Sequence, residues 1–337
     1  MDRLLDPLRE EDPLPPSEVD VDRAIRVGRR RLRTRWVGTG VLVAAVALLV
    51  PVLGLPGGSG SSVDPATSSQ RAAETRDFDP MRRVVTVADV PGIVTDSYTT
   101  ARRWQRISVR NAGWTGLGSV TVHAPGRQAA DPEGGVLRPE TGTPTEPVDG
   151  RPAYWMSRPS GDLLAWQWTD DAWAFVSYQD VRTEREVDRE TARRIALAVR
   201  VGDGEPVTVP FTLPRPASYQ LVGTTADLRP PGDPYVRTGL LFATEDPADE
   251  GRFVDCLAVA VENGERVASQ NGVNQTVDGH PAMVDGRKVT LYGVAAGFAV
   301  DVWGGTADAA ASLAVARSVR LVPTPDDRST WTTRPLG

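Results

Sequence analysis

The chain has 337 residues, of which 40% are apolar and 24% charged, and its formal net charge is −6. Because single cores usually stop growing near about 250 residues, we expect more than one domain. One cysteine and two histidines exclude an internal disulfide framework and a cage of thiolates around a metal.

Basic residues are concentrated before residue 36. Residues 23–35 contain seven arginines and no acid, whereas the chain after residue 55 carries 29 basic and 36 acidic residues. A basic stretch can bind nucleic acid, but this one directly precedes an apolar run, which favours positive-inside membrane topology. We therefore interpret residues 1–35 as an arginine-rich cytoplasmic tail and expect no nucleic-acid partner.

Residues 36–55 are predicted to form a transmembrane helix. They carry no charge, and their number is close to the roughly 20 residues that a helix needs to span a bilayer. The prediction is a single-pass protein of the cell membrane, with the lipid bilayer as a partner, a cytoplasmic N-terminus and an extracytoplasmic remainder. The residues flanking the membrane would be Arg29, Arg30, Arg31, Arg33, Arg35 and Trp36. A cleaved signal peptide is the alternative, but the basic region is long and no Ala-x-Ala cleavage site follows.

Residues 56–79 read as a flexible linker, because they are rich in Gly, Ser, Pro and Ala without apolar periodicity. Beyond them the sequence repeats itself. Val-Asp-Gly-Arg-Pro-Ala at 148–153 matches Val-Asp-Gly-His-Pro-Ala at 277–282, and similar residues end an alanine-rich segment at 195–201 and at 315–321. We therefore predict two tandem related domains, residues 80–203 and 204–323. The polar, proline-bearing residues 324–337 are predicted to be a disordered tail.

Each copy is expected to contain paired strands and one helix. In the first copy, residues 164–168 and 172–178 alternate around an Asp-Asp turn. In the second, residues 289–294 and 298–303 do so around Gly297, and further short strands are expected at 107–109, 119–123, 239–243 and 257–261. The fold class predicted is α+β, with an antiparallel sheet packed on a C-terminal helix in each domain.

The two predicted helices span residues 188–201 and 307–321. Helical spacing places one packing stripe on Ala192, Ile195, Ala196 and Val199, and the other on Ala311, Ala314, Val315 and Val319.

The repeated Val-Asp-Gly-x-Pro-Ala turn, the paired strands and the terminal alanine-rich helix resemble extracytoplasmic domains of actinobacterial single-pass membrane proteins. Some of those proteins are membrane-bound anti-sigma factors, and their sheet-and-helix build is similar to lipoprotein-carrier-like domains. The resemblance covers residues 140–323. It departs from the anti-sigma pattern at residues 1–35, which contain neither the histidine nor the cysteines of the zinc motif common in that family.

Little in the sequence indicates catalysis, and we predict neither an enzyme nor a cofactor or metal site. His123 and His280 lie far apart, no Gly-x-Ser-x-Gly elbow is present, and the Gly-rich stretch at 57–60 lacks a phosphate-binding lysine. Cys256 lies in an apolar stretch and reads as a small buried hydrophobe. Asp246, Asp249 and Glu250 around Pro247 read as a solvated acidic loop rather than a calcium site.

The most suggestive feature is a group of aromatic residues in the first copy. Tryptophans on a sheet can line a groove for a lipid, glycan or peptide, although they more often form core. The candidate groove residues are Trp155, Trp166, Trp168 and Trp173.

We therefore expect a membrane-anchored extracytoplasmic binding or sensing module that meets an envelope ligand or a protein partner. The alternative is a transmembrane regulator of the anti-sigma-factor type, which would bind a cytoplasmic partner through residues 1–35.

Overall fold

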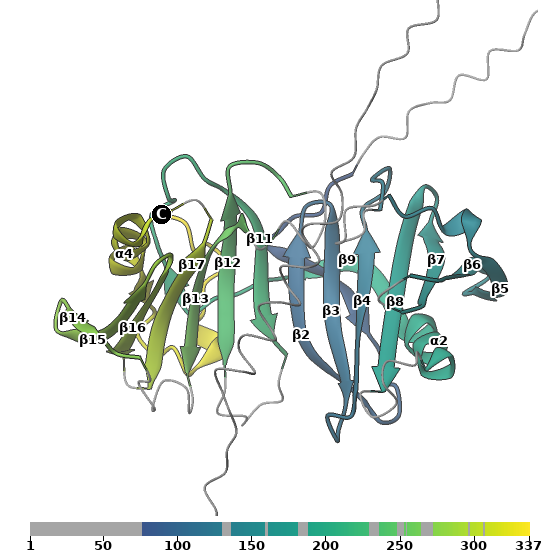
Figure 1. Ribbon diagram of the computed structural model, residues 1–337, viewed down its shortest axis with the longest axis horizontal. Helices are drawn as coiled ribbons and strands as arrows, with labels where there is room; N and C mark the ends of the chain where they lie inside the picture. The colour runs from purple at the N-terminus through teal and green to yellow at the C-terminus, as the bar shows by residue number, and fades with distance from the viewer. Residues whose placement is uncertain are drawn as a thin grey trace, which may run out of the picture. The chain divides into compact units, whose positions relative to one another are not determined.

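A computed structural model describes the chain beyond residue 75, within a compact unit that spans Ser68–Gly337. The described residues are 76–129, 136–158, 161–180, 188–228, 236–247, 253, 255–263, 272–295, 297–305 and 307–337. Elements are named as in Figure 1.

One order of elements occurs twice along the described chain (Figure 1). The first half consists of β1 (Arg82–Val87), β2 (Ile93–Ala101), β3 (Trp104–Asn111), β4 (Gly116–His123), η1 (Pro139–Thr141), β5 (Thr143–Val148), β6 (Arg151–Met156), β7 (Leu163–Thr169), β8 (Ala172–Asp180), α2 (Arg189–Ala198) and β9 (Val199–Pro206). The second half consists of β10 (Phe211–Thr212), β11 (Gln220–Asp227), β12 (Arg237–Ala243), β13 (Leu257–Asn263), β14 (Gln275–Val277), β15 (His280–Asp285), β16 (Lys288–Ala295), β17 (Phe298–Gly304), α4 (Ala309–Ser318), β18 (Arg320–Leu321) and η3 (Arg328–Thr330).

Fourteen strands of the described chain form one antiparallel sheet that runs through both halves. From its centre outward the first half contributes β2, β3, β4, β8, β7, β6 and β5, and the second contributes β11, β12, β13, β17, β16, β15 and β14. The strands that meet at the centre, β2 and β11, are therefore equivalent in the two halves. Two small sheets, β1–β9 and β10–β18, are equivalent in the same way.

The junction between the halves is buried and polar. The hydroxyls of Thr100 and Thr224 lie 2.7 Å apart, and the Thr224 amide donates to the Thr100 hydroxyl at 2.9 Å. A Cβ added at Gly223 would lie 2.3 Å from the Thr100 carbonyl oxygen, so a glycine is needed where the two backbones meet.

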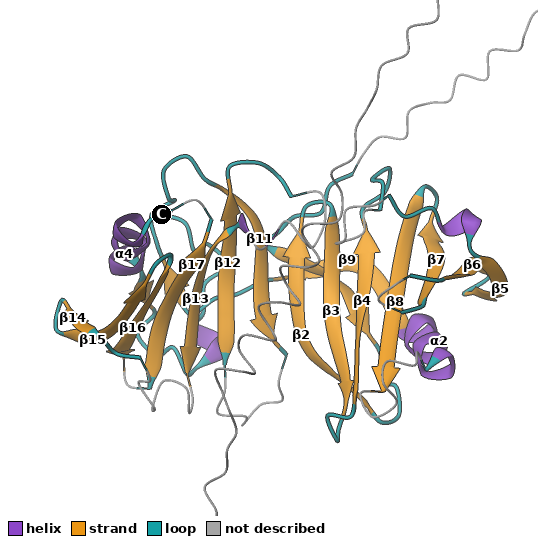
Figure 2. Cartoon of the chain, viewed as in Figure 1, coloured by secondary structure: helices purple, strands orange, loops and turns teal. Residues whose placement is uncertain are grey.

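The predicted α+β class is wrong, because strands dominate the described chain (Figure 2) and a single sheet replaces the separate sheet expected in each domain. The two helices, α2 and α4, do pack on this sheet, α2 against β8 and β7 and α4 against β16 and β17. They are ten residues each. One continuous core cluster contains buried residues of both halves, such as Ile107 in β3, Ile195 in α2 and Val300 in β17. The pairing of β2 with β11 thus merges what the sequence predicted as two separate units.

The predicted hairpins are confirmed. Strands β7 and β8 meet at Asp170–Asp171, where Asp171 has φ +54°, and β16 and β17 meet near Gly297, which has φ +77°. The repeated Asp-Gly pairs are turn residues as predicted, with φ of +51° and +73° at Asp149 and Gly150. The earlier strands expected in each copy are also present as β3, β4, β12 and β13.

Both helices end three residues earlier than predicted, because Val199 and Val319 adopt extended backbone and lead into β9 and β18. The side chains of Asp188 and Asp308 cap the helix starts by accepting from the amides of Thr191 and Ala311, at 2.9 and 2.8 Å. In α2 the predicted residues Ala192, Ile195 and Ala196 are buried. In α4 the predicted stripe is half right: Val319 is buried and Val315 packs against the core, but Ala311 and Ala314 are exposed, whereas Ser312 and Ala316 are buried.

The C-terminal residues differ from the predicted disordered tail. They include η3 and pair with the strand segment around β10: Val209 and Thr332 exchange backbone hydrogen bonds of 3.1 and 3.0 Å, and the Leu213 amide donates to the Pro335 carbonyl at 2.8 Å. The Trp331 indole N–H donates to the Pro325 carbonyl at 2.9 Å. Residues 324–337 therefore belong to the folded unit.

Within the described residues there is no helix with the length and apolarity needed to cross a membrane. This finding corrects the predicted transmembrane helix and the single-pass membrane localisation as far as the described chain extends. The predicted span at 36–55, its flanking arginines 29, 30, 31, 33 and 35, and Trp36 lie outside the described residues.

Candidate functional site

A cavity of about 180 Å³ lies in the first half, where the end of α2 passes the turn between β5 and β6 and the edge of β7. We call it the α2 cavity. It is lined by Val148, Asp149, Arg151, Trp166, Gln167, Trp168, Ala196, Leu197, Val199, Arg200 and Val201. Two of the four tryptophans predicted as groove residues are among them.

The aromatic wall of the α2 cavity is rigid. Trp166 and Trp168 are two residues apart in β7, so their side chains leave the same face of the sheet. Trp166 is buried in the main core, with 3% of its surface exposed. Trp168 is half-buried, and its indole N–H donates to the His123 carbonyl at 3.0 Å. Both rings are therefore held in place by the sheet.

The other two predicted groove tryptophans lie elsewhere. Trp155 packs against the main core on β6, with the Arg189 guanidinium 4.9 Å above its ring. Trp173 packs with Leu163, Ala165 and Phe175 in a separate cluster, 6.0 Å from the ring of Tyr154. Because residues alternate along a strand, Trp173 faces the side of the sheet opposite Trp166, and the four tryptophans do not form one groove.

The two arginines of the α2 cavity are already engaged. Arg200 donates to the carbonyls of Leu197 and Val199, each at 2.8 Å, and thereby places its charge at the C-terminal end of α2, where the helix dipole favours a cation. Arg151 donates to the Asp170 carboxylate at 3.1 Å.

Asp149 is the charged residue of the α2 cavity that is not engaged. Its carboxylate has no ion pair or hydrogen bond within the described part of the chain, and the residue is exposed. Leu197 at the end of α2 also lines the cavity; it is 44% exposed and is one of the few large apolar side chains at the surface of the described chain. The cavity thus presents an unpaired carboxylate beside an apolar rim.

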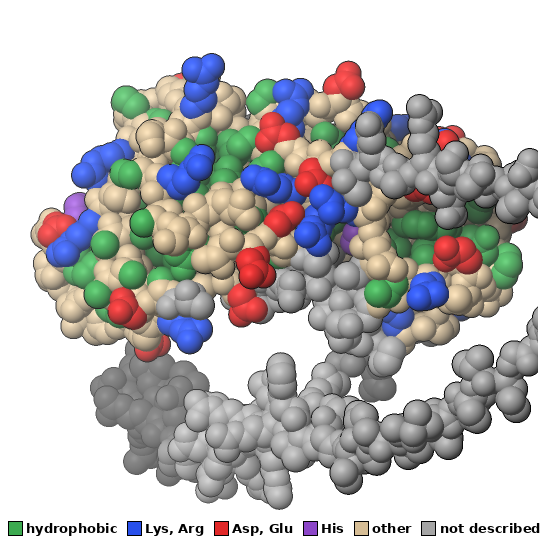
Figure 3. Space-filling view, turned by 90° about the horizontal axis from the view of Figure 1, so that it is seen from above, with side chains coloured by type: hydrophobic (Ala, Val, Ile, Leu, Met, Phe, Trp, Pro, Cys, Tyr) green, Lys and Arg blue, Asp and Glu red, His purple; other side chains and the backbone are tan. Residues whose placement is uncertain are grey.

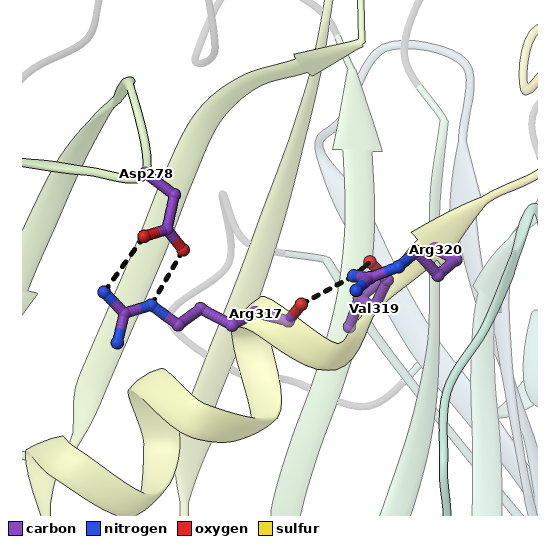
Figure 4. A network of polar contacts seen from close by, with 4 residues as sticks. All are labelled: Asp278, Arg317, Val319 and Arg320. Atoms are coloured by element: carbon purple, nitrogen blue, oxygen red, sulfur yellow. Dashed lines mark hydrogen bonds and ion pairs between the residues drawn. The ribbon is translucent and has the colours of Figure 1, made fainter.

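In the second half the residues at the equivalent positions form an ion pair. Asp278 occupies the position of Asp149, and Arg317 is the ninth residue of α4 as Leu197 is the ninth residue of α2. The Arg317 guanidinium binds both carboxylate oxygens of Asp278, at 2.8 and 3.2 Å (Figure 4).

The helix end itself is built alike in both halves. Arg320 donates to the carbonyls of Arg317 and Val319 at 2.6 and 3.0 Å, as Arg200 does at the end of α2 (Figure 4). The aromatic wall, however, is confined to the first half. Ala153 pairs with Trp166, whereas the equivalent Ala282 pairs with Leu291. The two halves therefore share a scaffold but differ in the cavity.

A second cavity, of about 230 Å³, lies beside the start of β13 and is lined by Tyr219, Ala243, Thr244, Glu245, Asp246, Pro247, Asp255 and Cys256. Arg103 binds the Asp246 carboxylate at 3.2 Å, so this member of the predicted acidic loop is partly neutralised. Asp249 and Glu250 lie outside the described residues. Cys256 is buried, as predicted, and burial raises the pKa of its thiol to about 11, with smaller contributions from Asp255 and Asp246. The protonated thiol is a poor nucleophile at neutral pH.

The histidines do not form a shared site. His123 is buried at the end of β4 with its ring 5.5 Å from that of Phe175, and burial lowers its pKa to about 4. His280 begins β15 in the other half, at the position of Arg151. Among the described residues there is no group of three or more His, Cys, Asp or Glu side chains placed to hold a metal.

Buried acids in the second half are a feature that the sequence analysis missed. Asp301 and Glu262 are 3% and 7% exposed on adjacent strands β17 and β13. The Thr290 hydroxyl donates to Asp301 at 2.5 Å, and Arg237 lies 3.9 Å from Glu262. Burial, followed by the charges of these two acids, raises the pKa of Tyr292. Asp301 shares one face of its strand with Ala299 and Trp303, and an acid among apolar residues on that face was the available signal in the sequence.

The outer surface carries charges of both signs. In the view from above, acidic and basic side chains are interspersed with apolar ones over the described residues (Figure 3). No protein-family model matches the chain, and no curated protein matches it. The geometry of its own two halves is therefore the comparison on which a function can be argued.

Proposed function

We propose that the chain is a binding module and that its ligand occupies the α2 cavity of the first half. The single observation that carries this proposal is that the ninth residue of the helix is Leu197 in the first half and Arg317 in the second. In the second half Asp278 and Arg317 form an ion pair, whereas in the first half Asp149 and the exposed Leu197 both line the cavity. The cavity of the first half therefore offers both a carboxylate and an apolar side chain to a ligand.

The walls of the α2 cavity support the same proposal. The half-buried Trp168 offers apolar surface, and its ring is fixed by the hydrogen bond to the His123 carbonyl, so little conformational entropy is lost when a ligand binds. A cavity of about 180 Å³ lies below the ~300–1,000 Å³ typical of sites for drug-sized molecules, so it suits a small group rather than a large one.

The substitution Leu197→Arg tests the proposal, because it places in α2 the residue that closes the second half. We expect calorimetric titration of the full chain with a panel of small probes to give saturable binding for at least one of them. The panel holds methylguanidinium, methylammonium, acetate, inorganic phosphate and glucose. Leu197→Arg should abolish that binding.

The matched control is Leu117→Arg, which introduces the same charge at a leucine of similar exposure in β4, 46% against 44%. This variant should bind as the wild type does. The proposal is contradicted if no probe binds, or if Leu197→Arg binds the same probe with unchanged affinity.

The regulator that would bind a partner through residues 1–35 stays a prediction, because those residues lie outside the described chain. No described contact favours it.

A further inference from the structure

We infer that the group recognised in the α2 cavity is a guanidinium cation, of the kind carried by an arginine side chain. This inference rests on the proposed function and names the chemistry of its ligand. It follows from what the second half holds at the equivalent place.

The second half contains an internal example of a guanidinium bound to the equivalent carboxylate. In the second half the Arg317 guanidinium uses two nitrogens on the two oxygens of Asp278, the forked geometry that matches a carboxylate (Figure 4). In the first half the turn that presents the carboxylate is retained, with φ of +51° at Asp149 against +50° at Asp278. The carboxylate receptor is therefore kept in the first half, while the internal arginine is replaced by Leu197.

The walls that differ between the halves also suit a guanidinium. Its planar, weakly hydrated face stacks on aromatic rings better than a compact ammonium does. In the first half the half-buried Trp168 lines the cavity together with Asp149, and Trp166 lies in the core behind this face of the sheet, where the second half has Leu291. The chain elsewhere stacks arginines on tryptophans, as Arg110 does on Trp114 at 3.8 Å.

An anionic ligand fits the α2 cavity less well, although two arginines line it. Arg200 is bound to two carbonyls at the end of α2, and Arg151 is bound to Asp170. An anion would have to displace these contacts and approach the unpaired Asp149.

The experiment is calorimetric titration of the full chain with N-acetyl-L-arginine amide, its neutral isostere N-acetyl-L-citrulline amide, N-acetyl-L-lysine amide and inorganic phosphate. The arginine probe should bind up to about fivefold more tightly than the citrulline probe, the ratio that one exposed ion pair supports. The lysine probe should fall between them, and phosphate should not bind. Methylguanidinium and an Ala-Arg-Ala peptide are titrated beside the arginine probe. Tighter binding of methylguanidinium indicates a free cation as the ligand, and tighter binding of the peptide indicates a peptide side chain.

Two variants locate the interaction. Asp149→Asn should reduce the affinity for the arginine probe to that for the citrulline probe, and Leu197→Arg should abolish binding of both. Arg317→Leu is the matched control, because it opens the second half without altering the α2 cavity and should leave the affinity of the first site unchanged.

The outcomes separate this inference from the function on which it rests. If phosphate or the citrulline probe binds as well as the arginine probe, and Leu197→Arg abolishes that binding, the α2 cavity is a ligand site but the guanidinium assignment is wrong. Unchanged affinity in Asp149→Asn likewise overturns the assignment alone. If none of these probes binds, the guanidinium assignment is wrong. Titration of the wild-type chain with the panel given under Proposed function then tests separately whether the chain is a binding module.

Discussion

At the scale of single residues, one position on two equivalent helices separates the halves. Arg317 binds Asp278, whereas Leu197 stands at the equivalent position in the first half and Asp149 has no ion pair or hydrogen bond within the described residues. Both members of the Asp278–Arg317 pair are about half exposed, 60% and 48%, so such a pair contributes at most about 1 kcal/mol to the free energy of unfolding. The difference therefore matters for access to the cavity more than for stability.

His123 is expected to make the protein sensitive to acid. Burial lowers its pKa from 6.5 to about 4, and its Nδ1 has no hydrogen-bond partner in the described chain. Between these two pH values the unfolded chain binds a proton that the folded chain does not, so stability is full above pH 6.5 and is lost as pH falls toward 4. The loss attributable to this residue is on the order of 3 kcal/mol.

Urea denaturation of wild type and His123→Gln at a series of pH values measures this loss. The free energy of unfolding of the wild type should fall more steeply between pH 6.5 and 4 than that of the variant. Parallel curves would show that His123 is protonated as easily in the folded protein as in the unfolded chain.

At the scale of elements, the contribution of the C-terminal residues 324–337 to stability can be tested by truncation. Deleting residues 324–337 would eliminate the hydrogen bonds of Thr332 with Val209 and those of Pro335 and Gly337 with Leu213. At about 1 kcal/mol for each of four bonds, we expect the free energy of unfolding to fall by about 3–5 kcal/mol.

Urea denaturation of the truncated chain measures this change, and Thr332→Ala serves as its control. The control keeps the backbone pairing and should cost less than about 1 kcal/mol. An unchanged midpoint after truncation would show that the segment does not stabilise the fold.

The elements that the sequence predicted correctly are those with a local signal. The Asp-Asp pair and Gly297 between alternating segments identify the β7–β8 and β16–β17 hairpins, and the Asp-Gly pairs identify the turns at 149–150 and 278–279, because such turns need residues that tolerate positive φ. In the α4 stripe the two valines were predicted correctly and the two alanines were not, because alanine occupies both buried and exposed positions of this helix and its composition does not distinguish the faces. The polar, proline-bearing composition of residues 324–337 predicts disorder, because composition carries no information on backbone pairing with a distant segment.

The same limit applies to the candidate site. Aromatic enrichment identified Trp166 and Trp168, which do line the α2 cavity, but it also included Trp173, which alternation places on the opposite face. The contrast between Leu197 and Arg317 was present in the aligned helix ends of the repeat. The sequence alone does not show that each helix end lies beside an Asp-Gly turn, so the pairing of Arg317 with Asp278 could not be predicted.

At the scale of the whole described unit, the junction of β2 and β11 decides the architecture. Pairing between segments more than a hundred residues apart leaves no local trace in sequence, and for this reason a single sheet was not foreseen. The pairing requires Gly223, since an added Cβ would meet the backbone oxygen of Thr100 at 2.3 Å and the ring of Phe253 at 2.9 Å.

We therefore predict that Gly223→Ala lowers the free energy of unfolding by about 2 kcal/mol or more, because a backbone oxygen cannot move aside without disturbing the sheet. Gly202→Ala is the matched control, since nothing lies within 4 Å of the Cβ it would add. Thermal unfolding of both variants by calorimetry makes the comparison. Equal stability of the two would show that the strands at the junction separate at little cost.

The central claim is that the first half holds an open ligand site that the second half closes with its own arginine. It is tested most directly by nuclear magnetic resonance titration of the isotope-labelled full chain with N-acetyl-L-arginine amide. We predict saturable shifts of the Trp168 indole N–H and of the backbone amides of Asp149 and Leu197, with the signals of Asp278 and Arg317 unchanged. Shifts of equal size at both places, or none at Trp168 and Leu197, would contradict it.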